Sequence, residues 1–291
     1  MSRVVPFVVV LGLTLGVAGC QPPLKAEVLL DQPYVAGGGA KQQLDLYLPA
    51  REHYPTVVFV HGGAWVMGDR KDAANGALAR ALQAQGVACA LVSYRLVPEA
   101  MPADQVRDVA AAFAWVRSEV AKRGGDGHRV FLAGHSAGGH LAAMVAGDPA
   151  FLKDQGLSPA DVAGCVTIGA PLVLSLDKSQ LSEALKDAPD WAQSLANSLG
   201  PIASALNGLD PSVYVGKGKP KMLVMVADGD YAAIRAQAAA FEKAAKGKGG
   251  LVETCVLVGR DHLSALSKMP LAGDQGLKRL LAFIGETPPA R

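Results

Sequence analysis

A sharp turn with a serine at its corner constrains this chain more than any other feature. Residues 129–133 read RVFLA, which is typical of a buried strand, and residues 139–146 read GHLAAMVA, which is typical of a helix. The intervening GHSAG at residues 134–138 places Ser136 at the bend. Glycines two positions before and after a serine leave room for a strained strand-to-helix turn that exposes the hydroxyl. Because the same five letters also occur in ordinary turns, the surrounding sequence must decide.

A second motif upstream supports the reading of Ser136 as a nucleophile. Residues 56–60 read TVVFV, a continuous apolar run expected for a strand buried on both faces, and HGGAW follows at residues 61–65. A glycine-containing loop at the end of such a strand can aim backbone N–H groups at a negative oxygen. We expect the N–H groups of Gly63, Ala64 and Ala137 to form this oxyanion hole. Trp65 fits either a pocket wall or a packed core indole.

The order of apolar runs predicts an α/β fold. Strands are expected at residues 27–30, 43–48, 56–60, 87–94, 129–133, 164–169, 221–226 and 252–258, and helices at 72–85, 104–121, 139–146, 232–246 and 274–284. Proline at positions 98 and 102 is expected to delay the second helix to Asp104. Alternation of strands and helices predicts a mostly parallel eight-stranded sheet with helices on both faces and an antiparallel edge formed by the first two strands.

The chain is expected to hold one catalytic domain at residues 27–291, which is within the size range of a single α/β domain. Residues 172–219 form a longer stretch between two expected strands, with helices predicted at 181–185 and 191–206. This stretch fits a lid or cap insertion, and it fits a crossover helix with loops equally well. A net charge of +2 shows no basic excess that would favour nucleic-acid binding.

The first residues predict an export leader. Arg3 precedes an almost wholly apolar run at residues 4–18, which is shorter than the roughly 20 residues of a membrane-spanning helix. The run ends in VAGC at residues 17–20, which resembles a bacterial lipobox, so residues 1–19 are expected to be a lipoprotein signal peptide. Cys20 would carry lipid and hold the protein on a membrane of the cell envelope, with residues 20–26 as a tether. An ordinary secretory leader is the alternative.

The remaining cysteines favour neither a disulfide framework nor a metal site. Cys89, Cys165 and Cys255 all lie in apolar runs, where buried free thiols are expected, and an odd number cannot pair completely. One disulfide among them stays open at this stage. The cysteines lack paired metal-ligand spacing and the chain has no HExxH run, so no metal and no cofactor is expected.

A serine nucleophile needs a base, and chain order indicates which one. Histidine, with an ordinary pKa of about 6.5, suits this task, and in α/β folds of this type the acid and then the histidine follow the serine. Beyond Ser136 lie only His140, one turn along the same expected helix, and His262, just past the last expected strand. His262 is therefore predicted as the base. Asp230 is favoured as the carboxylate that orients it, with Asp228 as the alternative.

These motifs resemble those of the α/β-hydrolase superfamily, in particular bacterial esterases related to hormone-sensitive lipase and kynurenine formamidase. The resemblance covers about residues 44–284 and rests on HGGAW (61–65), YRLVPE (94–99), GHSAGGH (134–140) and GRDH (259–262). In that family the acid follows a glycine and two further residues; here Ala227 takes the glycine position, which again indicates Asp230. Ala64 stands where many relatives have glycine, so the resemblance implies short acyl or acetyl esters rather than bulky tertiary alcohol esters.

The sequence thus predicts a serine carboxylesterase that hydrolyses a small-molecule ester through an acyl-enzyme intermediate. Ser136 would be the nucleophile, His262 the base and Asp230 the orienting acid. Two alternatives remain open: a formamidase or peptidase with the same three residues, and a lipid-anchored binding protein without catalytic activity.

Overall fold

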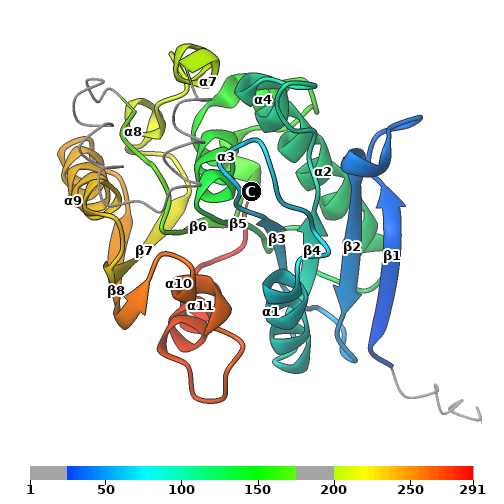
Figure 1. The fold of residues 1–291 in the computed structure, drawn as a ribbon. Helices are drawn as coiled ribbons and strands as arrows, with labels where there is room; N and C mark the ends of the chain where they lie inside the picture. Colours follow the sequence, from blue (N-terminus) through cyan, green and yellow to red (C-terminus); the bar gives the residue numbers. More distant parts are fainter. Residues whose placement is uncertain (1–24, 175–199, 291) are drawn as a thin grey trace, which may run out of the picture.

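The computed structural model describes residues 25–174 and 200–290, and a single eight-stranded sheet runs through them (Figure 1). In order along the chain the strands are β1 (Glu27–Pro33), β2 (Gln43–Leu48), β3 (Thr56–Val60), β4 (Ala88–Val92), β5 (Val130–His135), β6 (Gly164–Ile168), β7 (Lys221–Gly229) and β8 (Val252–Asp261). Their order in the sheet is β1-β2-β4-β3-β5-β6-β7-β8. β2 is antiparallel to both β1 and β4, and the other neighbouring strands are parallel. The predicted fold class and antiparallel edge are confirmed.

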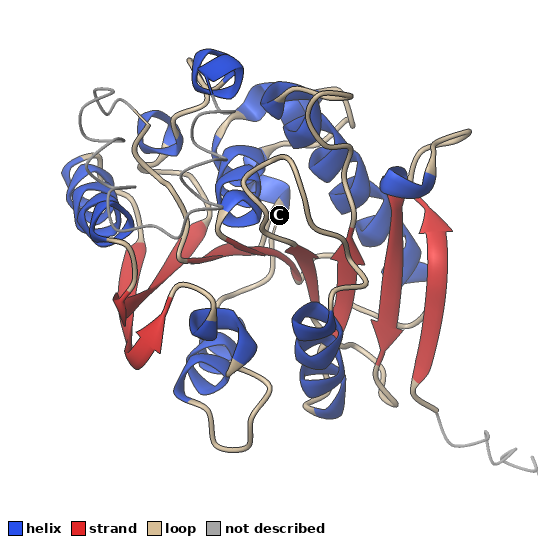
Figure 2. Cartoon of the chain, in the orientation of Figure 1, coloured by secondary structure: helices blue, strands red, loops and turns tan. Residues whose placement is uncertain are grey.

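Helices cover both faces of this sheet (Figures 1 and 2). The longer ones are α1 (Ala73–Ala84), α2 (Pro102–Lys122), α3 (Ala137–Gly147), α9 (Ala232–Gly247) and α11 (Gln275–Glu286). Short helices are α4 (Pro149–Lys153), α7 (Gly200–Ala205), α8 (Pro211–Tyr214) and α10 (Ser264–Ser267), with single 3₁₀ turns η1 (Ala40–Gln42) and η2 (Pro159–Asp161). α1, α10 and α11 pack on one face, and α2, α3 and α9 pack on the other.

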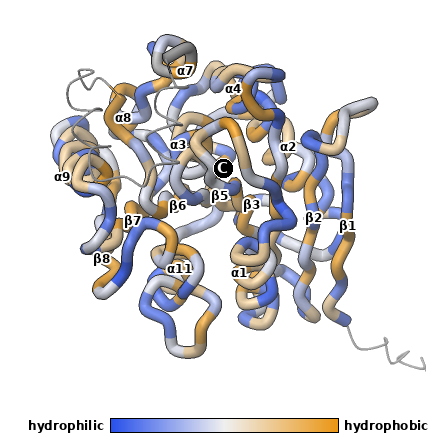
Figure 3. Tube along the Cα trace, viewed as in Figure 1, coloured by the Kyte–Doolittle hydropathy of each residue, from blue (hydrophilic) through white to orange (hydrophobic). Residues whose placement is uncertain are grey.

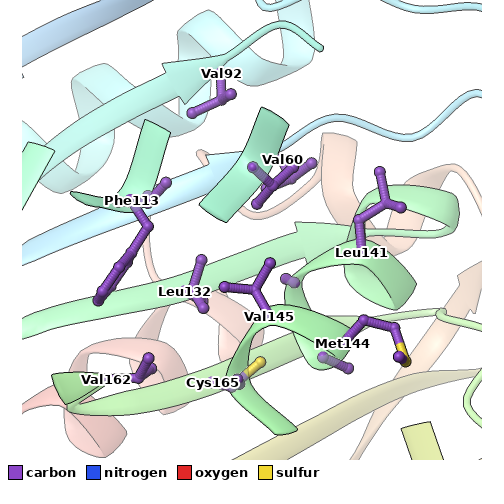
Figure 4. Packing of buried hydrophobic residues seen from close by; sticks show 14 of the residues in the cluster. Val60, Val92, Phe113, Leu132, Leu141, Met144, Val145, Val162 and Cys165 are labelled. Atoms are coloured by element: carbon purple, nitrogen blue, oxygen red, sulfur yellow. The ribbon is translucent and has the colours of Figure 1, made fainter. Parts of the chain in front are cut away.

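Alternating strand residues supply two hydrophobic cores, one on each face. In β3, Val57 and Phe59 belong to the core beneath α1 and α11, whereas Val58 and Val60 belong to the core beneath α2 and α3. Figure 4 shows Leu141, Met144 and Val145 of α3 beside labelled strand residues Val60, Leu132 and Cys165. Every residue of α3 is buried, and Figure 3 shows hydrophobic residues both in the strands and in the helices that cover them. This packing fixes the helix that begins directly after Ser136.

Several expected boundaries are corrected by the structure. α2 begins at Pro102 rather than Asp104, because a proline in the first helical turn lacks an N–H that would have no helical partner there. β8 continues to Asp261 rather than ending at residue 258, so His262 is the first residue of the turn that follows the strand. The predicted helix 181–185 lies outside the described residues, and only the end of the predicted helix 191–206 is described, where α7 is found.

Two further findings concern the cysteines and the membrane. Cys89, Cys165 and Cys255 are free thiols, the first two buried and the third half-buried. Cys20 and the rest of the predicted leader and tether up to residue 24 lie outside the described part of the chain. Within residues 25–174 and 200–290, no helix combines the length and apolar character needed to cross a bilayer.

A buried ion pair connects the loop after β3 to the antiparallel edge. The Arg70 side chain is 3% exposed, and its Nε donates to Oδ1 of Asp45 on β2 at 3.0 Å. The same guanidinium donates to the carbonyl of Ala40 and to the side chains of Asp31, Gln43 and Ser93. These contacts hold the segment that follows HGGAW against β1 and β2.

Removing this buried cation should strongly destabilise the fold. We expect Arg70→Ala to lower the free energy of unfolding by about 3–5 kcal/mol, because Asp45 would remain as an uncompensated buried charge. Urea unfolding at pH 7 measures the change. Arg107→Ala is the matched control, since Arg107 pairs with Asp104 on the exposed surface of α2 and such pairs contribute about 0.2–1 kcal/mol. Equal losses in the two variants would contradict the assigned role of Arg70.

Candidate active site

The backbone at Ser136 has the strained geometry expected of an exposed nucleophile. Ser136 has φ 53° and ψ −124°, between the last residue of β5 and the first residue of α3. Its N–H donates to the carbonyl of Ile168 at the end of β6, which fixes the bend to the neighbouring strand. A left-handed conformation of a residue with a side chain is unfavourable by about 1–3 kcal/mol, and it persists only where the surroundings impose it.

Ser136, His262 and Asp230 come together at the carboxyl ends of the parallel strands. The Ser136 hydroxyl lies 3.0 Å from Nε2 of His262, and Nδ1 of His262 lies 2.8 Å from Oδ1 of Asp230. The Asp230 side chain is completely buried and the His262 side chain is 12% exposed. This is the nucleophile, base and orienting carboxylate arrangement of serine hydrolases.

Asp230 is oriented by its own loop at the end of β7. Its Oδ1 also accepts the N–H of Tyr231 at 2.8 Å, while its Oδ2 is buried and has no hydrogen-bond partner among the described residues. Gly169, with φ +56°, faces this carboxylate so closely that a built Cβ would lie 2.8 Å from Oδ2. The position after β6 therefore has to be a glycine for the acid and the base to fit.

Asp228, the alternative acid, forms hydrogen bonds to the backbone instead of contacting His262. Its carboxylate accepts the N–H groups of Gly229, Gly259 and Arg260, and these bonds tie the end of β7 to the end of β8. The two backbone bonds from Gly259 and Arg260 lower the pKa of Asp228. The structure thus places Asp230, and not Asp228, on His262.

The predicted oxyanion loop lies directly beside Ser136. A Cβ built on Gly62 would be 3.2 Å from Cβ of Ser136, and Gly63 has φ +123°. Within residues 25–174 and 200–290, the N–H groups of Gly63, Ala64 and Ala137 donate to no protein atom. Such N–H groups, fixed by the fold and free of protein acceptors, are suited to receive a negative oxygen.

Two other histidines form contacts that brace the site. Nε2 of His135 lies 2.9 Å from the carbonyl of His262 and donates to it, so the residue before Ser136 holds the backbone of His262. His61 donates from Nδ1 to the carbonyl of Gly62 at 2.7 Å and stacks on Tyr94, with ring centroids 4.4 Å apart. Burial lowers the pKa of both imidazoles, that of His135 to about 4.

Three of these contacts were not predicted from the sequence: the bond from His135 to the His262 carbonyl, the fit of Gly169 against Asp230, and the Tyr231 ring, whose centroid lies 4.8 Å from that of His262. The available sequence signal for these two residues was their position, because His135 directly precedes Ser136 and Tyr231 directly follows Asp230.

Trp65, for which the sequence left a pocket wall and a core position open, is a core residue that is 7% exposed. Among the described residues no group of three or more His, Cys, Asp or Glu side chains is arranged to hold a metal.

Comparison with known proteins agrees with this geometry. The BD-FAE family model matches residues 44–244, which is more than half of the chain. The chain belongs to the BD-FAE family. The matched region contains the oxyanion loop, Ser136 and Asp230, while His262 lies beyond it.

The proteins of known name that resemble this BD-FAE chain include several esterases. It is 28% identical over 270 residues to "Probable isoprenylcysteine alpha-carbonyl methylesterase ICMEL1" of Oryza sativa subsp. japonica, covering 88% of this chain and 62% of that protein. It is 43% identical over 100 residues to "Esterase LipC" of Mycobacterium tuberculosis, covering 33% of this chain and 25% of that protein. The chain thus spans less than two thirds of the length of these relatives.

Solved structures of esterases share the fold over most of the BD-FAE chain. Esterase B of Lactobacillus rhamnosis is 26% identical with a TM-score of 0.72, and the match covers 89% of this chain and 87% of that one. Est2 of Thermogutta terrifontis is 25% identical with a TM-score of 0.66, covering 90% of this chain and 92% of that one. A butyrate-bound form of Est2 is also among the matches.

The buried histidines make the fold sensitive to acid. Burial lowers the pKa of His135 and of His140 to about 4, whereas a histidine in the unfolded chain titrates near about 6.5. Between these values the unfolded chain binds more protons than the folded one, so the free energy of unfolding falls as the pH falls. We expect each histidine to remove on the order of 2 kcal/mol between pH 7 and pH 5.

Urea unfolding at pH 7, 6 and 5 measures this dependence. His140→Gln should show a shallower loss of stability between pH 7 and pH 5, because glutamine does not titrate. His128→Gln, which removes an exposed histidine, is the matched control. The interpretation is contradicted if the wild-type protein and His140→Gln lose the same free energy of unfolding over this range.

Proposed function

We propose that this protein is a serine carboxylesterase that hydrolyses short-chain acyl or acetyl esters. The observation that carries the proposal is the continuous contact from the Ser136 hydroxyl through His262 to the buried Asp230 carboxylate. Membership of the BD-FAE family, esterase relatives and esterase neighbours support the reaction class. The butyrate-bound Est2 structure supports a short acyl group by analogy.

The geometry accounts for each step of acyl transfer. His262 accepts the Ser136 proton at Nε2 as the oxygen attacks the ester carbonyl, and Asp230 stabilises the imidazolium that forms. The negative oxygen of the tetrahedral intermediate receives hydrogen bonds from the N–H groups of the oxyanion loop and of Ala137. Collapse of the intermediate returns the proton to the leaving alcohol. Water, deprotonated by the same histidine, then releases the acid from Ser136.

The first test replaces single residues of the hydrogen-bonded series Ser136, His262 and Asp230. Ser136→Ala should lower kcat on p-nitrophenyl acetate by at least about 10⁴-fold, and Asp230→Asn by a comparable factor, because each interrupts the activation of the nucleophile. Asp228→Asn is the matched control, since this neighbouring carboxylate bonds only to backbone N–H groups in the described structure; a loss below about tenfold is expected. Retained activity in Ser136→Ala would identify a different nucleophile.

A substrate panel tests the bond and the acyl group. We expect acetyl and butyryl esters to be cleaved with higher kcat/KM than esters of long-chain acids, and faster than N-formylkynurenine or small peptides. The panel should include acetylated sugars and feruloyl esters. Preference for the formyl amide or for peptides would replace the esterase assignment by a formamidase or peptidase, and no turnover with any member would favour a binding protein.

We further propose that Cys20 anchors the protein by lipid to a membrane of the cell envelope. β1 runs antiparallel to β2, which runs antiparallel to β4, so Glu27 lies at the amino-end side of the parallel strands. The described domain therefore begins at the end of the sheet opposite to Ser136. We expect Cys20→Ala to move the protein from the membrane fraction to the soluble fraction without changing kcat. An unchanged membrane fraction would contradict the anchor.

A further inference from the structure

Three consecutive residues of the oxyanion loop have a left-handed backbone. Gly63 has φ +123°, Ala64 has φ 49° and Trp65 has φ 65°. Ala64 and Trp65 carry side chains, so this conformation is unfavourable by roughly 1–2 kcal/mol for each residue. It persists only where neighbouring contacts impose it. The directions of the Gly63 and Ala64 N–H groups depend on this backbone. The loop therefore needs contacts that hold it from outside.

Trp65 is the residue through which the loop is held. Its carbonyl accepts the N–H of Val97 at 3.1 Å and the amide of the buried Gln105 at 2.8 Å. Its indole N–H donates to Nδ1 of His140 at 3.3 Å, and the two rings meet edge to face with centroids 5.4 Å apart. The backbone of Trp65 is thus fixed by Val97 and by Gln105 on α2, and its side chain is fixed by His140 on α3.

The partners of His140 fix which of its nitrogens carries the proton. An indole N–H can only donate, so Nδ1 must be the acceptor, and the proton lies on Nε2. Nε2 lies 2.8 Å from the carbonyl of Leu209, which can only accept. The imidazole is completely buried and makes both bonds only in this neutral form.

His140 is also fixed to the nucleophile turn. Its backbone N–H donates to the carbonyl of Ser136 at 3.2 Å in the first turn of α3, the helix whose first residue supplies the Ala137 N–H. One residue after Leu209, the Asp210 carboxylate accepts the N–H of Leu174, which follows β6. His140 therefore connects the oxyanion loop, the Ser136 turn and the segment between β6 and β7.

We propose that His140 is a positioning residue that acts through Trp65 to set the directions of the Gly63 and Ala64 N–H donors relative to Ser136. This inference rests on the proposed hydrolase function of the same site. His140 does not touch substrate in this account. Its effect is on the transition state, because oxyanion donors interact most strongly with the oxygen that becomes negative.

Two substitutions separate the two bonds of His140. In His140→Asn the amide oxygen takes the place of Nδ1 and keeps an acceptor for Trp65, while the bond to Leu209 is lost. In His140→Gln the amide nitrogen takes the place of Nε2 and keeps a donor for Leu209, while the acceptor for Trp65 is lost. We expect His140→Gln to lower kcat about 10- to 100-fold with little change in KM, and His140→Asn to lower it less than about fivefold.

A second variant and a binding measurement distinguish positioning from a purely structural role. Trp65→Phe removes the indole N–H and should lower kcat as His140→Gln does, and the double variant should be no worse than either single one. Inhibition by a phenylboronic acid, which forms a tetrahedral adduct with the serine hydroxyl, should weaken in His140→Gln by the same factor as kcat. The free energy of unfolding of each variant is measured in parallel.

The outcomes separate this inference from the proposed function. If His140→Asn and His140→Gln lose kcat equally, or if the boronic acid binds His140→Gln as tightly as the wild-type protein, the positioning role is wrong even when the wild-type protein is an esterase. If the wild-type protein binds the boronic acid but cleaves only amides, the esterase assignment fails and the comparison of variants still tests His140. A wild-type protein without turnover or boronic-acid binding would overturn both.

Discussion

The close contact between the start of α3 and the end of β3 is the constraint on which the rest of the site depends. A Cβ built on Gly138 would lie 2.2 Å from the carbonyl oxygen of Val60, and a Cβ built on Gly134 would lie 2.4 Å from the backbone of Gly138. No side chain fits at either glycine without moving the backbone. Ser136 is held between them with φ 53°, and the oxyanion loop follows β3 at the same point. The glycines therefore allow nucleophile and oxyanion donors to come from two neighbouring strands.

The histidines of the site differ in burial, and this difference separates their roles. His61, His135 and His140 are buried, and burial lowers the pKa of each, so at neutral pH they act as hydrogen-bonding groups without charge. His262 reaches the Ser136 hydroxyl and has a partly exposed side chain. Because burial lowers the pKa of His135 to about 4, this imidazole places no positive charge beside the ring of His262, whose centroid is 4.9 Å away.

Local patterns and chain order were enough to predict the fold class and to bring Ser136, Asp230 and His262 to one edge of the sheet. These predictions succeed because parallel strands put the loops that follow them at the same end. The sequence could not predict contacts between side chains of different loops, such as Trp65 with His140, or Gly169 with Asp230. The predicted start of α2 at Asp104 was wrong by two residues, because the helix begins at Pro102 and proline is tolerated in the first helical turn.

The central claim is that His262 activates Ser136 for attack on an acyl carbon. The most direct measurement is the rate of covalent labelling by a fluorophosphonate, followed by mass spectrometry of the labelled peptides. The account predicts one adduct, on Ser136, and a labelling rate that falls at least about 100-fold in His262→Ala while the fold is retained. An adduct on another residue, or an unchanged rate in His262→Ala, would contradict it.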